Sequence, residues 1–174
     1  LGDVYKRQAD NGLGWTSSDY GIYTGAYSFL NVFCLMLIWG GLILDRFGIR
    51  FTGKLATILM VVGTGLEYYA MTSMVGTADT ILGYKADVFV ASAGYSVFGV
   101  GAEVAGITVT KMIAKWFRGK EMATAMGVQV ALARVGSQAA YAVAIPVARS
   151  FELTTPVLIG LCLLYTSDAA DDRI

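Results

Sequence analysis

Hydrophobic and polar positions along this chain alternate in long blocks rather than residue by residue. Four long, sparsely charged stretches are separated by short charged or polar connections. About 20 apolar residues suffice for a helix to cross the hydrocarbon core of a bilayer. The pattern therefore predicts four membrane-spanning helices, at residues 20–44, 55–75, 88–112 and 122–147.

The connections carry the signals of helix ends. Residues 9–19 form a polar, glycine-rich lead, and Ser17, Ser18 or Asp19 is expected to cap the first helix. We expect the fourth span to end near Pro146, and Pro156 suits the first turn of a further helix.

Basic residues are distributed unevenly between the two sides that these spans define. The turns at 45–54 and 111–121 hold seven of them, namely Arg46, Arg50, Lys54, Lys111, Lys115, Arg118 and Lys120. The opposite connections hold only Lys85 and Arg149. Short loops rich in lysine and arginine stay on the cytoplasmic side. Both basic turns are therefore predicted to face the cytoplasm.

Composition agrees with a membrane protein and narrows its chemistry. Charged residues make up 15% of the chain and hydrophobic ones 56%, whereas soluble domains carry about 25% charged residues. A net charge of zero gives no reason to expect a nucleic-acid partner. Histidine is absent, and Cys34 and Cys162 stand in no metal or redox spacing. We expect no enzymatic activity and no cofactor or metal.

Glycines recur within the predicted spans. Gly21 and Gly25 are one helical turn apart, and Gly94, Gly99, Gly101 and Gly106 crowd the third span. Because small residues let helix backbones approach closely in lipid, this pattern predicts tight helix packing. The same glycines could instead leave room for a substrate path.

Glu67, Glu103 and Arg134 are the ionisable residues well inside the predicted spans. A charge at the bilayer centre costs roughly 2.5–3.5 kcal/mol on insertion scales, so such residues face water or an opposite charge. Glu103 and Arg134 lie at similar distances from the turn at Arg118, which predicts a neutralising pair near mid-membrane. The pair could join two helices only, or line a central cavity and bind a substrate's ammonium and carboxylate groups. Glu67 is either a hydrogen-bonded protonated acid or a proton carrier.

The two ends of the chain read as laboratory sequence. Residues 1–8 resemble an in-frame translation of a sequencing-library adapter, and residues 162–174 resemble its reverse complement. We therefore expect residues 9–161 to be the natural part, and exclude both ends from fold reasoning. The alternative is a short natural amphipathic start with an acidic tail.

Residues 41–50, GLILDRFGIR, resemble the signature of the major facilitator superfamily, G-x-L-x-D-R-x-G-x-R, between that family's second and third helices. The resemblance implies an all-α integral membrane fold of twelve helices in two halves, of which this chain would hold helices two to five and the start of six. It also implies alternating access around a midplane site. Asp45 and Arg46, at a cytoplasmic helix end, are expected to form a conformational charge network. The gating motif would comprise Gly41, Asp45, Arg46, Gly48 and Arg50, although Arg46 and Arg50 could simply mark topology.

A narrower resemblance is carried by FGVGAE at 98–103, KWFRGKE at 115–121 and GVQVALARVGS at 127–137. These strings look like the lysosomal dipeptide transporter branch of the superfamily and its bacterial relatives. That branch would imply dipeptide uniport, with Glu103 and Arg134 meeting the peptide termini. One position departs from many family members, because Tyr95 stands where they carry an arginine linked to proton coupling.

Three functions follow as hypotheses. The first is a carrier of dipeptides or similar zwitterions by uniport, in a bacterial cytoplasmic membrane. The second is a proton-coupled carrier of sugars or organic anions, with Arg134 holding the anion and Glu67 or Glu103 titrating. The third is a non-transporting membrane subunit or sensor. The expected partners are a small-molecule substrate, the lipid bilayer and the remainder of the same chain.

Overall fold

The computed structural model describes residues 15–33, 36–74, 80–81, 83–117, 119–150 and 155–171. These ranges hold five helices, α2 (Ser17–Phe33), α3 (Met36–Ser73), α4 (Ala86–Trp116), α5 (Lys120–Ser150) and α6 (Thr155–Asp171). Strands β1 (Thr80–Ile81) and β2 (Tyr84–Lys85) pair as a short antiparallel hairpin. Apart from this hairpin the described chain is helical, which confirms the expected all-α class.

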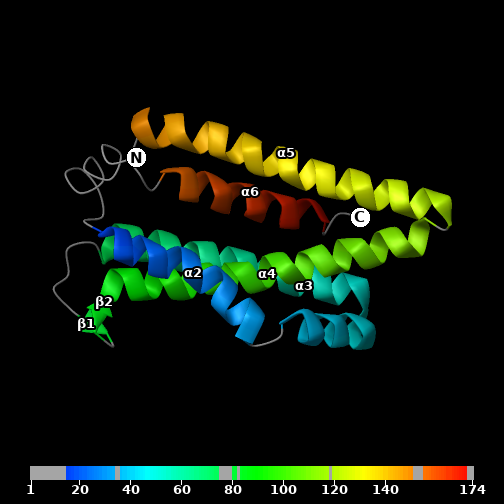
Figure 1. Ribbon diagram of the computed structural model, residues 1–174, viewed down its shortest axis with the longest axis horizontal. Coiled ribbons are helices and arrows are strands. Elements are labelled where there is room, and N and C mark those ends of the chain that lie inside the picture. The colour runs from blue at the N-terminus through cyan, green and yellow to red at the C-terminus, as the bar shows by residue number, and fades with distance from the viewer. Residues whose placement is uncertain are drawn as a thin grey trace.

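The helices form an elongated bundle (Figure 1). α3 and α4 share the most extensive contact, α2 packs on α4, and α6 contacts both α3 and α5. Two helical stretches within the described ranges are long and apolar enough to cross a membrane, Ile38–Ser73 and Ala86–Trp116. With these segments the fold is that of an all-α membrane protein.

A sharp break at Gly48 divides α3 into two arms. An unbroken helix of 38 residues would extend about 57 Å, nearly twice the hydrocarbon core of about 30 Å. Gly48 has φ 83° and ψ 174°, a conformation that glycine adopts without a Cβ clash. The predicted span 20–44 is therefore shared between α2 and the first arm of α3, and the predicted span 55–75 corresponds to the second arm.

The two basic turns lie at the same end of the bundle. The bend within α3 and the connection between α4 and α5 both stand at the end of the bundle away from the β hairpin (Figure 1). Lys111 near the end of α4 forms an ion pair with Asp45 at the end of the first arm of α3. The sequence prediction that these turns share one side is consistent with this arrangement. Arg118 of the second turn lies outside the described residues.

The N-terminal cap of α2 differs from the sequence expectation. The backbone N–H of Thr16 donates to Asp19 Oδ2 at 2.9 Å, and the backbone N–H of Asp19 donates to Thr16 Oγ1 at 3.2 Å. This reciprocal arrangement is a capping box in which Thr16 is the cap. The expected caps Ser17 and Ser18 are instead the first residues of the helix.

The C-terminal boundaries also differ in part. α5 continues through Pro146 to Ser150, so the proline does not end the helix as expected. α6 runs from Thr155 to Asp171 and crosses the boundary that the sequence places after residue 161. The adapter-like residues 1–8 lie outside the described residues, and the division of the chain at 8 and 161 stays a prediction.

Glycines bring the backbones of α3 and α4 into contact. A Cβ at Gly63 would lie 2.5 Å from the Phe98 backbone nitrogen, and one at Gly94 would lie 2.8 Å from the Gly63 carbonyl oxygen. Seven residues beyond Gly94, a Cβ at Gly101 would lie 2.8 Å from the carbonyl oxygen of Ala56. The packing role expected for the third-span glycines holds at these positions. A Cβ at Gly21, Gly25 or Gly106 would meet nothing within 4 Å.

Three buried threonine hydroxyls are satisfied by the backbone of their own helix. Thr52, Thr64 and Thr108 are buried, and each donates to the carbonyl four residues earlier at 2.8–2.9 Å. An unpaired polar group in hydrocarbon costs several kcal/mol. This bond to the preceding turn therefore lowers the cost of placing these three threonines inside apolar helices.

Alanine at Gly94 is expected to destabilise the chain, because its methyl group would overlap the backbone of α3. Overpacking of this kind costs about 1–3 kcal/mol. Gly106→Ala in the same helix is the matched control, since that position is open and alanine favours helix. Thermal unfolding in detergent, monitored by size-exclusion chromatography, should show a lower midpoint temperature for Gly94→Ala than for the wild type, and an unchanged one for Gly106→Ala. Equal midpoints would contradict the packing described here.

The capping box makes a prediction about pH. The hydrogen bond from the Thr16 backbone lowers the pKa of Asp19 from its ordinary value of 3.8, with Lys85 acting in the same direction. The cap is therefore formed above pH 3.8 and is lost as the pH falls through the lowered pKa. A ¹³C NMR titration of the Asp19 carboxyl should give a pKa below 3.8. The pKa should stay below 3.8 in Lys85→Met, because the hydrogen bond from the Thr16 backbone lowers it more than Lys85 does. A pKa at or above 3.8 would contradict the capping box.

Candidate polar site between α2, α3 and α4

Glu67 lies at the centre of the three-helix contact. Its side chain is buried, with 6% exposure, and Tyr23 of α2 donates its hydroxyl to Glu67 Oε2 at 3.3 Å. Glu67 Oε1 is buried and has no hydrogen-bond partner among the described residues. A buried carboxyl with one unpaired oxygen is costly when ionised. The arrangement suits a protonated acid that binds the neighbouring helix, one of the two roles expected for it.

Aromatic rings continue this contact along α2 and α4. Tyr23 stacks on Tyr95 with ring centroids 4.7 Å apart, and Tyr95 in turn stacks on Phe98 at 6.1 Å. The ring of Tyr27 is tilted by 47° against that of Tyr95, with centroids 5.3 Å apart. Tyr95, the position at which the sequence departs from many family members, is thus a packing residue of the α2–α4 interface.

Glu103 is half-buried on α4. The ring of Tyr27 lies over Gly99, one turn before Glu103, where a Cβ would come within 2.8 Å of the ring. Glu103 therefore stands at the edge of the tyrosine cluster rather than within the contact between α3 and α4.

Arg134 lies apart from Glu103 in this structure. The side chain of Arg134 is exposed on α5, and α5 diverges from α4 beyond their shared turn (Figure 1). The ion pairs that the structure gives within the described ranges are Asp19–Lys85 and Asp45–Lys111. The expected direct pair of Glu103 with Arg134 is thus not formed here, because few contacts hold the two helices together away from the turn.

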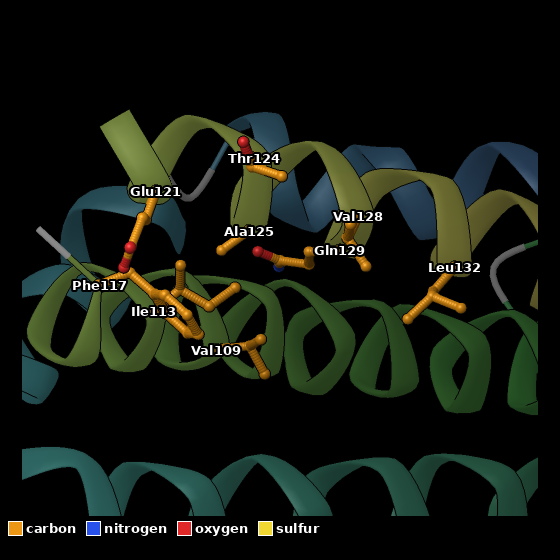
Figure 2. A pocket seen from close by; sticks show the side chains of 9 residues that line it. All are labelled: Val109, Ile113, Phe117, Glu121, Thr124, Ala125, Val128, Gln129 and Leu132. Atoms are coloured by element: carbon orange, nitrogen blue, oxygen red, sulfur yellow. The ribbon is translucent and has the colours of Figure 1, made fainter. Parts of the chain in front are cut away.

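The space between α4 and α5 near their turn is an apolar groove. It measures about 710 Å³, and nine residues line it (Figure 2), namely Val109, Ile113, Phe117, Glu121, Thr124, Ala125, Val128, Gln129 and Leu132. Gln129 points across the groove from α5 and reaches Thr110 Oγ1 at 3.5 Å. This contact joins the two helices at the end of the bundle that carries the basic turns.

The residues of the expected gating motif surround the break in α3. Gly41 is half-buried, Gly48 forms the break, and Arg46 and Arg50 are exposed. Asp45 is held by Lys111, although both side chains are largely exposed to solvent. An exposed ion pair contributes about 0–1 kcal/mol, which suits a contact that opens and closes better than a permanent clasp.

Polar contacts also join α2 and α4 at the opposite end. Trp15 Nε1 donates to Asp87 Oδ2 at 2.8 Å, and Lys85 lies 3.7 Å from Asp19. In the middle, Ser96 Oγ lies 2.8 Å from the carbonyl oxygen of Ala26. These contacts attach α2 to α4 at the start and in the middle of α2.

Comparison with known proteins points to a transporter. Over 113 residues the chain is 34% identical to the lysosomal dipeptide transporter MFSD1 of Danio rerio, 31% to that of Mus musculus and 30% to that of Homo sapiens. This chain resembles a membrane transporter. The similarity supports the relationship to the major facilitator superfamily that the sequence motif suggests.

The extent of these matches is limited. Each covers 64% of this chain and 21% of the relative. No family model matches the chain, and no solved structure matches it.

Sequence reasoning had not singled out Tyr23, Tyr27 and Asn31. These residues recur every four positions along α2, so they share one helix face. The facing residues Tyr95, Gly99 and Glu103 have the same spacing on α4. Two matching stripes of polar, aromatic and small residues in adjacent spans were the signal that could have identified this interface.

A cysteine pair at Asp45 and Lys111 is predicted to crosslink readily, because the ion pair brings these side chains together. Oxidation should give a disulfide in Asp45→Cys/Lys111→Cys, seen as altered mobility on a non-reducing gel after cleavage of the intervening chain. The control pair Asp45→Cys/Lys85→Cys joins opposite ends of the bundle and should stay reduced. Equal yields in both pairs would argue against the two basic turns sharing one end.

Proposed function

We propose that this chain is part of a secondary transporter that moves dipeptides or similar small zwitterions by alternating access and uniport. The observation that carries the proposal is the placement of opposite charges on two neighbouring helices. Glu103 on α4 is half-buried and Arg134 on α5 is exposed, and no ion pair joins them in the described structure. Charges inside spans that do not neutralise each other are available to a charged ligand.

The chemistry of the two groups matches a zwitterion. A carboxylate attracts an ammonium group, and the planar guanidinium of arginine binds a carboxylate through two parallel hydrogen bonds. A substrate with both groups would neutralise both residues at once. The similarity to lysosomal dipeptide transporters supports a peptide as that substrate.

The movement follows from how α2, α3 and α4 are joined. Glycine contacts hold α3 to α4, and polar contacts hold α2 to α4 at the start and in the middle of α2. These three helices would therefore move as one body. α5 has few contacts with α4. The substrate path would therefore open between the unit formed by α2, α3 and α4 and the helices that face it.

Orientation and membrane belong to the same proposal. The two basic turns would lie in the cytoplasm, and the Asp45–Lys111 pair would open and close with the cytoplasmic gate. A bacterial cytoplasmic membrane remains the proposed location. This location rests on the sequence resemblance alone. The compared proteins are lysosomal proteins of vertebrates and do not support it.

A proton-coupled carrier of sugars or organic anions is the second candidate. The observation in its favour is Glu67, whose buried Oε1 lacks a hydrogen-bond partner among the described residues. A non-transporting subunit is less well supported, since of the three intramembrane charges only Glu67 is buried between helices. Uptake measured with and without a pH gradient separates uniport from proton coupling, because uniport of a zwitterion should not respond to the gradient.

Arg134→Lys is predicted to weaken peptide uptake by the full-length carrier. Lysine keeps the charge but cannot form the two parallel hydrogen bonds, so KM for a dipeptide should rise about tenfold. Ser137→Ala on the same helix is the control, because the Ser137 hydroxyl donates to the carbonyl oxygen of Ala133 within α5. Uptake unchanged in Arg134→Lys would argue against a two-pronged carboxylate contact at this residue.

A further inference from the structure

The groove between α4 and α5 is open rather than enclosed. Figure 2 shows Phe117 and Glu121 at the end next to the turn and Leu132 at the opposite end. Val128 and Leu132 are 52% and 65% exposed although they line the groove. Six of its nine lining residues are apolar. Apolar cavities exclude water and take up apolar molecules, so in a membrane this groove favours hydrocarbon.

The groove has the length of one membrane leaflet. From Glu121 to Leu132 it runs about 16 Å along α5, at about 1.5 Å per residue. Half of the hydrocarbon core of a bilayer is about 15 Å thick. Near the turn end Trp116 is 78% exposed, and exposed tryptophan is typical of the membrane interface. The groove therefore begins at headgroup level and ends near mid-membrane, which is the depth of one acyl chain.

The headgroup end of the groove carries a negative charge. Among the nine lining residues the charged one is Glu121, which is exposed in the first turn of α5. Its carboxylate repels an anionic headgroup and attracts one that bears an ammonium group. Arg118 and Lys120 adjoin Glu121 in the sequence, and basic residues at the cytoplasmic end of a span attract lipid phosphate. The sequence of this turn thus offers a partner for each charge of an aminophospholipid.

We propose that the groove binds one phospholipid of the cytoplasmic leaflet, with an acyl chain along the groove and a primary-amine headgroup, such as ethanolamine, at Glu121. Direct contacts between α4 and α5 are few, and the Gln129–Thr110 contact spans 3.5 Å. The lipid fills the space beside this contact and holds the two helices together at the end where they share a turn. The inference needs the membrane orientation only, so it applies whichever solute the carrier moves.

Native mass spectrometry of the full-length carrier in mild detergent tests the acyl-chain site. The wild type should retain one phosphatidylethanolamine molecule. Ala125→Phe should abolish this retention, because the added ring occupies the groove that the acyl chain needs. Ala123→Phe on the same helix is the matched control, since Ala123 is exposed and does not line the groove. Retention in Ala123→Phe should equal that in the wild type.

Glu121→Gln tests the headgroup contact separately. The wild type should retain phosphatidylethanolamine about threefold to tenfold more than phosphatidylcholine, whose methylated ammonium donates no hydrogen bond. Glu121→Gln should still retain a lipid, but without that preference.

Three results would overturn the proposal. The first is equal retention by Ala125→Phe and the wild type, and the second is equal retention of both lipids by the wild type. The third is a wild type that retains no lipid, which would indicate that another segment of the full-length chain covers the groove. Since lipid binding is measured without transport, none of these results bears on the proposed function.

Discussion

Backbone contact between α3 and α4 is the constraint on which the rest of the structure depends. Lipid surrounds both helices with material as apolar as their own side chains, so packing rather than water exclusion must hold them together. Gly63, Gly94 and Gly101 supply that packing by removing the side chains that would keep the backbones apart. The contact sets the depth and rotation of α4, and through them the direction in which Tyr95, Gly99 and Glu103 face.

The intramembrane acids acquire different environments from this geometry. Glu67 on α3 lies where α2, α3 and α4 meet. One of its carboxyl oxygens accepts a hydrogen bond from Tyr23, and the other is buried without a partner among the described residues. Glu103 on α4 lies at the margin of the tyrosine cluster and stays half-buried. A residue enclosed by helices suits an architectural or proton-holding role, whereas one at the margin can meet a ligand.

Much of the fold was predictable because the bilayer imposes a strong pattern on sequence. Long apolar stretches placed α4 and α5 to within a few residues, and the glycine-containing charged motif located the turn at Gly48. The division of the first predicted span between α2 and α3 was not predictable, because no charge or proline interrupts residues 20–44. Pro146 was misread as a helix end, although a proline within a helix removes one hydrogen bond and need not end it.

The candidate site was predictable only in part. Glu67, Glu103 and Arg134 stand out in the sequence because charged residues are rare in membrane spans, where each costs several kcal/mol to insert. Whether two such charges meet depends on how the helices diverge, and sequence spacing gave Glu103 and Arg134 matching depth but no contact. The tyrosines of α2 were overlooked because an aromatic residue in a span is as common in packing as in recognition.

The account depends most on a substrate whose two charged ends are recognised separately. Binding to the full-length carrier should be measured for one dipeptide and for its N-acetylated and C-amidated forms, since each modification removes one charge and leaves the rest of the molecule in place. The account predicts that either modification weakens binding by more than about tenfold, because a carboxylate or a guanidinium is then left without its partner. Equal affinity for all three compounds would contradict recognition of a zwitterion by this site.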